Sequence, residues 1–204
     1  MAKRRTHHTR GRARSRVAPE SKRNPWLLLR RSRIQGRGVY ARKDIPKGTR
    51  LIEYTGERIS TAEADRRSEK EDEKHPHHTF LFILNSRTCV DATSGGNVSR
   101  FINHSCDPNC AAWIEGRHIW IDAERDIAKG EELSYDYEYD FLRGYTVTDL
   151  EMYECRCGSP LCRGTLVAVP PRKKHLIRQL WRRRKARERA RRAQRAKRAK
   201  GTRR

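Results

Sequence analysis

Apolar residues in this chain occur in short runs that are broken by Gly, Pro, Asp and Asn. An amphipathic helix repeats its apolar positions every three or four residues, whereas short apolar runs between turn residues are typical of β-strands. We therefore predict a mostly β fold built from short strands. The runs are Trp26–Leu29, Val39–Tyr40, Leu51–Tyr54, Phe80–Leu84, Cys89–Val90 and Ile119–Ile121.

Two stretches of the chain resemble each other, Lys43–Leu51 and Arg125–Leu133. Each predicts a strand, a tight turn that ends on Gly, and a second strand. Between them, the capping-box pattern Ser60–Glu63 predicts a short helix that ends near Ser68. The charged, His-rich stretch Lys70–His78 is expected to be an exposed loop.

The stretch Arg172–Lys200 contains no Gly or Pro and is rich in Ala, Arg and Lys, which favours a helix. Near its start, four apolar residues share one side of such a helix. We expect them to dock on the globular part of the chain or on a partner: Leu176, Ile177, Leu180 and Trp181.

Positive charge is concentrated at the two ends. Residues 1–25 carry nine Lys and Arg against one Glu, and residues 172–204 carry eighteen against one Glu, while the part between has a net charge of −2. We interpret 1–25 as a disordered basic arm and 169–204 as a basic, Arg/Ala-rich helical tail. Basic side chains that meet phosphates release counterions, so the tails predict contact with DNA or RNA. Contact with an anionic membrane surface and solvated, disordered tails without a partner are the alternatives.

No stretch reaches the roughly 20 apolar residues of a membrane span, and the N-terminus lacks the apolar run of a signal peptide. We therefore expect neither a membrane span nor export.

In a reducing compartment, cysteines indicate metal binding before disulfides. Three thiols occur within the eight residues Cys155–Cys162, and tetrahedral zinc takes four ligands. The fourth ligand has three candidates, Cys89, Cys106 and Cys110. Three free or redox-active thiols are the alternative.

Two further segments combine polar and aromatic side chains. Arg100–Cys110 is compact and polar, and it includes the neighbours Asn103 and His104. In Glu131–Tyr139 tyrosines alternate with acidic residues, and on a strand their rings would share one face. That face would be either an aromatic core or a slot for a cation. The three rings are those of Tyr135, Tyr137 and Tyr139.

Five motifs follow one another along the chain: Gly36–Tyr40, Glu53–Glu57, Arg100–Asn109, Gly130–Tyr137 and Cys155–Cys162. In this order they resemble a SET domain with a post-SET zinc motif, in a short, stand-alone form similar to the single-domain members found in bacteria. The resemblance implies a fold of small sheets in which the Asn103 and Tyr137 segments cross in a knot-like threading. It divides the chain into a SET domain at 26–140 and a post-SET zinc segment at 141–168.

The resemblance also implies an S-adenosylmethionine-dependent protein-lysine methyltransferase. The cofactor would lie against the first glycine-rich turn, the polar segment and flanking aromatic residues. These positions are Gln35, Gly36, Arg37, Gly38, Phe80, Arg100, Phe101, Asn103, His104, Tyr137 and Phe141.

The substrate lysine would enter from the opposite side, through a channel that the resemblance lines with Phe80 and the catalytic residues Tyr54, Tyr135 and Tyr137. Tyr137 would orient the amine for in-line attack. The same resemblance places Cys106 at the fourth zinc position. The implied site is one structural Zn²⁺ per chain, held by Cys106, Cys155, Cys157 and Cys162.

We expect a monomer that acts on a histone, a histone-like protein or another DNA- or RNA-associated protein. It would be cytoplasmic or nucleoid-associated in a bacterium, and nuclear and on chromatin in a eukaryote. Two other functions stay open. One is a catalytically weak chromatin- or nucleoid-binding module that retains the fold, and the other is a zinc-stabilised nucleic-acid-binding protein without enzyme ancestry.

Overall fold

The computed structural model describes residues 24–72 and 80–201. The predicted basic arm therefore lies outside the described residues except for Asn24 and Pro25, and most of the predicted loop Lys70–His78 lies outside them as well. None of the helices in the described part combines the length and the apolar character that a membrane crossing requires.

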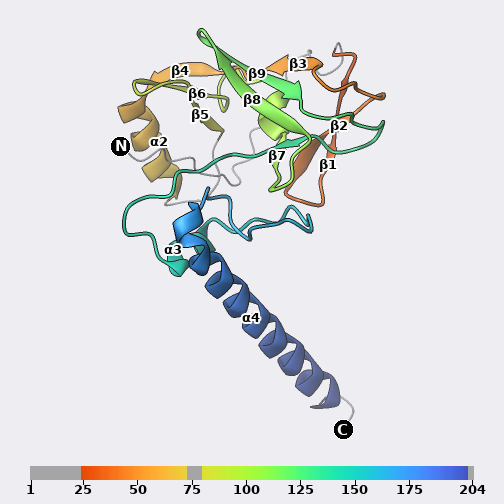
Figure 1. Ribbon diagram of the computed structural model, residues 1–204, viewed down its shortest axis with the longest axis vertical. Coiled ribbons are helices and arrows are strands. Elements are labelled where there is room, and N and C mark those ends of the chain that lie inside the picture. Colours follow the sequence, from red (N-terminus) through yellow and green to blue (C-terminus); the bar gives the residue numbers. More distant parts are fainter. Residues whose placement is uncertain (1–23, 73–79, 202–204) are drawn as a thin grey trace.

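The predicted short strands form four small sheets (Figure 1). A two-stranded sheet joins β1 (Leu27–Arg31) to β2 (Arg37–Ala41), and a three-stranded sheet has the order β3 (Arg50–Glu53), β9 (His118–Ala123), β8 (Cys110–Glu115). A second three-stranded sheet has the order β4 (Glu57–Ser60), β6 (Thr88–Asp91), β5 (Leu81–Ile83). Every pair in these three sheets is antiparallel.

The fourth sheet contains the one parallel pair among the sheets of the described residues, β7 (Asn103–His104) with β10 (Ser134–Tyr135). Asn103 is opposite Ser134, and His104 is opposite Tyr135. The pair follows the short 3₁₀ helix η1 (Val98–Phe101). Two of the sequence motifs, about thirty residues apart, thus lie side by side, as the SET resemblance implies.

The two similar stretches pair with each other. Ile45 and Ile127 exchange backbone hydrogen bonds of 2.9 Å in both directions. The amide of Lys47 donates to Asp126 Oδ1 at 2.8 Å, and the amide of Lys129 donates to Asp44 Oδ1 at 2.7 Å. Each stretch therefore supplies a carboxylate that accepts from a backbone amide in the turn of the other. The likeness of the two sequences did not reveal this pairing.

Helix α2 (Thr61–Asp72) begins at the predicted capping box but runs beyond Ser68. Half of the box forms, because the Glu63 amide donates to Ser60 Oγ at 3.1 Å while the Glu63 carboxylate binds Arg66 and Arg67. Arg67 also pairs with Glu57 at 2.8 Å and with the buried Asp91 at 2.7 Å. This network fastens α2 to β4 and β6, and the helix continues past its predicted end to Asp72.

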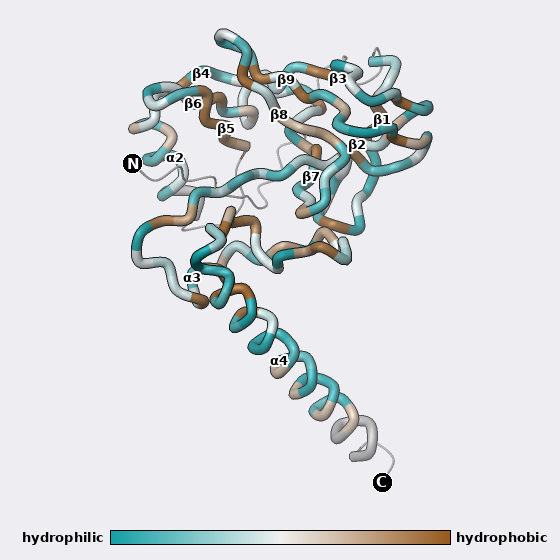
Figure 2. The backbone as a smooth tube through the Cα atoms, viewed as in Figure 1, coloured by the Kyte–Doolittle hydropathy of each residue, from teal (hydrophilic) through white to brown (hydrophobic). Residues whose placement is uncertain are grey.

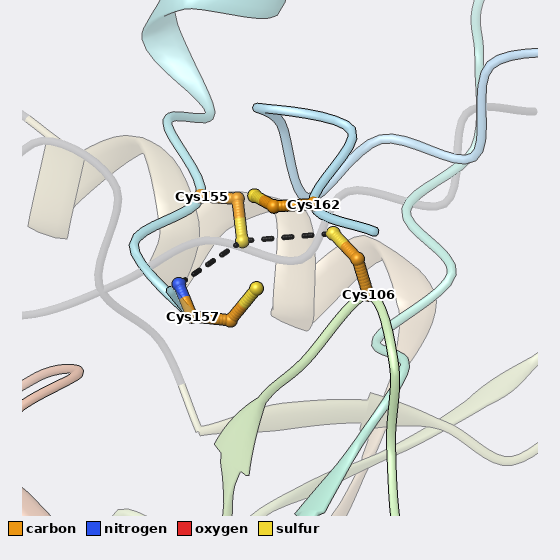
Figure 3. Close-up of side chains that lie close together, drawn as sticks. All are labelled: Cys106, Cys155, Cys157 and Cys162. Carbon is orange, nitrogen blue, oxygen red and sulfur yellow. Dashed lines mark hydrogen bonds between the residues drawn. The ribbon is translucent and has the colours of Figure 1, made fainter. Parts of the chain in front are cut away.

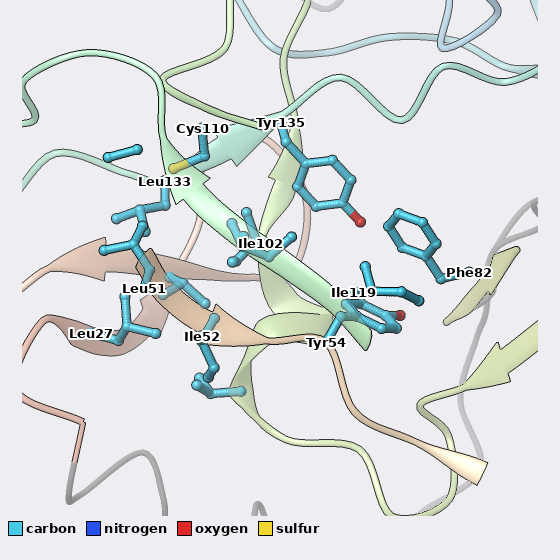
Figure 4. Close-up of a cluster of buried hydrophobic side chains, with 14 of the residues drawn as sticks. Leu27, Leu51, Ile52, Tyr54, Phe82, Ile102, Cys110, Ile119, Leu133 and Tyr135 are labelled. Atoms are coloured by element: carbon cyan, nitrogen blue, oxygen red, sulfur yellow. The ribbon is translucent and has the colours of Figure 1, made fainter. Parts of the chain in front are cut away.

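The main hydrophobic core lies between the sheets and includes Leu27, Ile45, Ile102, Ile121 and Leu133, each at most 1% exposed (Figure 4). A second core lies on the C-terminal side. It joins α3 (Val147–Met152) to α4 (Lys174–Gly201), which follows the 3₁₀ turn η2 (Pro171–Lys173).

Helix α4 confirms the predicted helical tail and the docking of its apolar patch. Leu176 and Leu180 are buried in the second core, and Ile177 packs against it. Beyond this contact the helix projects away from the rest of the molecule (Figure 1), and it is polar along most of its length (Figure 2).

The predicted tyrosine strand is shorter than its pattern suggests. Strand β10 ends at Tyr135, and Glu138 takes a left-handed backbone conformation with φ of 48°. The three rings nevertheless follow one another, with centroids 5.0 Å apart from Tyr135 to Tyr137 and 5.9 Å from Tyr137 to Tyr139. The strand ends early because Tyr139 belongs to the second core while Tyr135 belongs to the main core.

Candidate active site and metal centre

Asn103 joins the first turn to the parallel strand pair. Its Nδ2 donates to the Arg37 carbonyl at 3.0 Å, to the Gln35 carbonyl at 3.4 Å and to Glu132 Oε1 at 2.8 Å. These bonds fix the orientation of the amide. The side-chain oxygen of Asn103 has no hydrogen-bond partner among the described residues, so it remains an acceptor for a bound donor such as an ammonium group.

Glu132 is a residue that the motif reading missed. Its carboxylate accepts from Asn103 on one oxygen and from the Tyr40 hydroxyl at 2.8 Å on the other. A Cβ at Gly38 would lie 2.2 Å from Glu132 Oε1, so Gly38 is required for this close approach. Glu132 lies three residues before Tyr135, within the same motif, and that position could have indicated a role in the site. The sequence interpretation assigned roles to the tyrosines of this motif only.

Next to this turn, two arginines and two phenylalanines cluster. The guanidinium carbon of Arg37 lies 4.6 Å from the centroid of the Phe101 ring, and that of Arg100 lies 4.8 Å from it. Phe80 packs edge-on against Phe101, with centroids 5.7 Å apart. Burial lowers the pKa of Arg100, but an arginine starts so far above neutrality that it stays charged. The cluster therefore supplies positive charge beside aromatic faces.

A second aromatic group contains the predicted tyrosines. Tyr54 contacts Phe82 at 5.3 Å between centroids, Phe82 contacts Tyr135 at 6.2 Å, and Tyr135 contacts Tyr137 at 5.0 Å. Figure 4 shows the rings of Tyr54, Phe82 and Tyr135 at one end of the buried cluster. Phe82 was not predicted; the structure places it between two predicted residues, and it places the predicted wall residue Phe80 against Phe101.

Two hydroxyl groups of this aromatic group donate to backbone oxygens. Tyr137 donates to the Ile102 carbonyl at 2.9 Å, and Tyr54 donates to the Phe80 carbonyl at 2.8 Å. A phenol oxygen can accept a hydrogen bond as well as donate one. Aromatic faces together with such oxygens favour a cationic or amine-bearing guest.

The four predicted cysteine ligands converge (Figure 3). The Sγ atoms of Cys106, Cys155, Cys157 and Cys162 all lie within 4.8 Å of one another, and those of Cys106 and Cys155 are 3.7 Å apart. Four sulfurs at about 2.3 Å from a tetrahedral zinc would be separated by about 3.8 Å. The donor set and its spacing therefore fit zinc.

Backbone amides support these sulfurs. The amide of Cys157 donates to Cys155 Sγ at 3.4 Å, and the amide of Gly164 donates to Cys162 Sγ at 3.3 Å. Such bonds stabilise thiolates and orient them toward a metal. Of the three candidates for the fourth ligand, Cys106 alone joins the group, because Cys89 and Cys110 are buried in other clusters.

The His104 side chain faces this cysteine group. Burial lowers its pKa to about 4, so the ring is neutral near pH 7. Nδ1 accepts from the Tyr137 amide at 3.1 Å, which leaves the proton on Nε2, 3.3 Å from Cys106 Sγ. His104 was predicted to contact the cofactor. Because its side chain contacts Cys106 and the Tyr137 amide, its backbone is the part that could contact the cofactor.

Asp136 connects the same region to the last cysteine. Although burial acts to raise it, hydrogen bonds from Arg163 hold the pKa of Asp136 below its usual value. The two side chains form a bidentate pair at 2.5 and 2.7 Å, and Arg163 also donates to the Leu166 carbonyl. This pair fastens the segment after Tyr135 to the loop that carries Cys162.

Phe141 packs against the second core, whereas the predicted cofactor residues Phe80 and Phe101 pack against the main core. Phe141 packs edge-on against Tyr145, with centroids 5.5 Å apart, on the second core. The structure thus groups Phe141 with the cysteine loop, while Arg100 and Phe101 lie on η1, where Phe101 contacts Arg37 of the first turn. Tyr137 packs against both cores, so it stands where the two groups meet.

Comparison with known proteins identifies the family of this arrangement. The SET domain family matches residues 36–138. Histone-lysine N-methyltransferase trr of Drosophila melanogaster is 43% identical over 141 residues, which are 67% of this chain and 6% of that protein. Histone-lysine N-methyltransferase 2D of Homo sapiens is 43% identical over 152 residues, 72% of this chain and 3% of that protein.

A third relative, "Histone-lysine N-methyltransferase, H3 lysine-4 specific" of Saccharomyces cerevisiae, is 40% identical over 150 residues, 72% of this chain and 14% of that protein. This chain thus spans only a small fraction of the length of these relatives. Among solved structures, one chain of a humanized mutant of the Chaetomium thermophilum Polycomb Repressive Complex 2 is 38% identical, with a TM-score of 0.48, over 54% of this chain and 14% of that chain.

Proposed function

Since the chain belongs to the SET domain family, we propose that it transfers a methyl group from S-adenosylmethionine to the ε-amine of a lysine in a protein. The observation that carries the proposal is the place of Tyr137. It lies at the meeting point of the two cores, beside Tyr135, with its hydroxyl tied to the Ile102 carbonyl. A phenol held in this way can orient an amine for attack.

S-adenosylmethionine, when bound, supplies an electrophilic methyl group on a sulfonium. Asn103 would accept from the cofactor's ammonium group through its unpartnered oxygen, and Arg37 and Arg100 would attract its carboxylate. The backbone of Gln35, Gly36, Gly38 and His104 and the rings of Phe80, Phe101 and Phe141 complete the proposed cofactor residues.

The lysine would approach along the aromatic group Tyr54, Phe82, Tyr135 and Tyr137. Only a neutral amine has a free lone pair, and an ordinary lysine has a pKa near about 10.4. Burial among aromatic rings and the nearby positive charge both disfavour the ammonium form. Tyr137 would then direct the lone pair toward the methyl group, while Tyr54 and Tyr135 shape the slot.

We assign the four-cysteine group as a structural zinc site. Four thiolates close the coordination shell and leave no position for a reactive water. The site would fasten the segment 141–168 to Cys106, two residues after His104. Its contribution to the reaction is therefore to hold the post-SET segment against the Tyr137 segment.

For the substrate, we propose a histone or another DNA- or RNA-associated protein, because the similar relatives are named histone-lysine methyltransferases. These relatives are eukaryotic, so the corresponding location is the nucleus, on chromatin. The basic ends of the chain add a proposed contact with DNA or RNA.

The test is to incubate the purified protein with isotope-labelled S-adenosylmethionine and core histones, and to map labelled lysines by mass spectrometry. Tyr137→Phe should lower transfer by about 10²–10⁴-fold, whereas Tyr153→Phe, a matched loss of a hydroxyl from a ring of the second core, should leave most of it. The rival function, a chromatin-binding module with the fold but without catalysis, predicts that neither the wild type nor the variants label any lysine.

A further inference from the structure

The arginines of α4 fall into two sets. Those of the first set make contacts within the protein. Arg184 donates to the Gly164 carbonyl at 2.7 Å and pairs with Glu154 at 3.1 Å, and Arg187 pairs with the Glu151 carboxylate at 2.7 Å. Arg183 approaches the same carboxylate at 3.5 Å. These residues fix the direction in which the helix leaves the second core.

The second set lies farther along the helix. Every residue from Lys185 to Ala196 is exposed, and the Arg187–Glu151 pair near its start is the contact that connects this part of the helix to the rest of the described residues. Figure 1 shows it standing clear of the sheets and of α3. Residues 185–201 contain nine Lys and Arg and a single Glu. At about 1.5 Å per residue, this segment is about 25 Å long.

We propose that this distal segment of α4, residues 185–201, is a docking surface for double-stranded DNA. The inference deepens the nucleic-acid contact proposed above and names its partner. A straight helix about 10–12 Å across fits the B-form major groove, which is about 12 Å wide. Its basic side chains then reach phosphates along both rims, over about seven base pairs at 3.4 Å each.

Other polyanions fit the segment less well. Single-stranded nucleic acids are bound by stacking bases on aromatic rings, and residues 182–201 contain no aromatic residue. The major groove of double-stranded RNA is too narrow for side chains to enter. An anionic membrane would need an apolar face on the helix, but the apolar residues of 185–201 are alanines and one glycine.

Repulsion between like charges destabilises the free helix, and a polyanionic partner would reduce that repulsion. Arg187, Arg191 and Arg195 follow one another four residues apart, and like charges at that spacing destabilise a helix. Glu188 relieves this at one point, through its pair with Arg192 at 2.6 Å. Phosphates on both rims would neutralise the remaining repulsion, so DNA should increase the helix content of the segment.

The experiment measures the fluorescence anisotropy of a labelled 16-base-pair duplex titrated with the full chain at several salt concentrations. The test variant replaces Arg189, Arg191 and Arg195 by Gln, three exposed positions of the distal segment. Its affinity should fall at least tenfold, and the slope of log K against log salt should flatten by about 0.9 for each lost phosphate contact. Circular dichroism at 222 nm should show helix gained on duplex binding in the wild type, and less in the variant.

The matched control replaces Arg31, Arg87 and Arg143 by Gln, which removes the same charge from exposed positions of the globular part. It should bind the duplex within about twofold of the wild type. Equal losses in the two variants, or no loss in either, would overturn the assignment of the surface. A tighter complex with single-stranded DNA, double-stranded RNA or phosphatidylserine vesicles would overturn the choice of partner. Methyl transfer to a short peptide is measured in parallel, so that failure of the docking surface is distinguished from failure of the enzyme.

Discussion

The imidazole of His104 lies against Cys106, with Nε2 3.3 Å from the Sγ atom. Its other nitrogen accepts from the amide of Tyr137 at 3.1 Å. One neutral ring thus connects a proposed zinc ligand to the backbone of the proposed catalytic tyrosine. The donor that it offers to a thiolate is the kind of outer contact that fixes a metal ligand.

Replacing His104 by Ala should therefore affect the metal and the reaction together. The four thiols remain, so zinc should still bind, with an affinity lower by about 10–100-fold. Transfer should fall because Tyr137 loses the acceptor of its amide. A chelator competition assay and steady-state kinetics on a peptide measure the two effects. His118→Ala is the control, since that histidine is exposed on β9 and pairs with Glu53; equal effects at both positions would argue against the link.

Zinc itself should be integral to the folded C-terminal segment. Cys157→Ser should reduce the metal content from about one zinc per chain to near zero, because the loss of one thiolate from a closed shell breaks it. Elemental analysis of the purified protein gives the content. Cys110→Ala, which alters a buried thiol of the main core, should keep its zinc. Active wild-type protein without metal would refute the four-cysteine site.

The elements that local sequence signals determine were predictable. Ser60 caps the start of α2, and the predicted stretch free of Gly and Pro forms all of α4 except its last residue, Gly201. The cysteine spacing supplied three members of the cluster of four cysteines, and the family resemblance supplied Cys106. These predictions succeeded because each depends on residues close together in the sequence, or on a motif order that is specific to one family.

Long-range partners were not predictable. The reciprocal bonds between Ile45 and Ile127 join segments that no periodicity relates, and the Glu132 carboxylate owes its role to Asn103 and Gly38 from two other strands. The alternation of tyrosines predicted a longer strand than the one that forms, because the chain turns at Glu138 and brings Tyr139 into a different core. Side-chain orientation, as at His104, depends on which backbone groups the fold brings near.

Truncation of α4 should have two different outcomes that depend on where it ends. A chain ending at Pro171 loses Leu180, which is fully buried, and Arg184, which donates to carbonyls of the cysteine loop at Cys155 and Gly164. Since loss of one buried leucine side chain typically costs about 2–5 kcal/mol, this chain should be destabilised and transfer poorly. A chain ending at Glu188 retains these contacts and should transfer to a peptide as the full chain does. Thermal unfolding and peptide kinetics compare the two, and equal behaviour would show that the docked part is dispensable.

Glu132→Ala should weaken cofactor binding more than it slows the chemical step. Without the carboxylate, Asn103 loses one of the acceptors that hold its amide nitrogen, and its oxygen is no longer held toward the ligand. The expected result is a KM for S-adenosylmethionine raised about tenfold with kcat reduced less. Glu131→Ala, which removes the neighbouring carboxylate bound to Arg125 and Asn109, is the control. A fall in kcat alone would place Glu132 in a different role.

The number of methyl groups added should depend on Tyr135. Its ring packs 5.0 Å from that of Tyr137 and is 6% exposed, so its hydroxyl occupies volume beside the proposed amine position. A hydroxyl there can bind the amine directly or through an ordered water, and a second or third transfer needs the amine to rotate into that space. We expect mainly monomethyl-lysine with some dimethyl-lysine from the wild type. Tyr135→Phe should shift the product toward di- and trimethyl-lysine, whereas Tyr137→Phe should depress all products together. Intact-mass analysis of one lysine peptide after long incubation with excess cofactor separates these cases. Trimethyl-lysine as the main wild-type product, unchanged in Tyr135→Phe, would show that another group sets the limit.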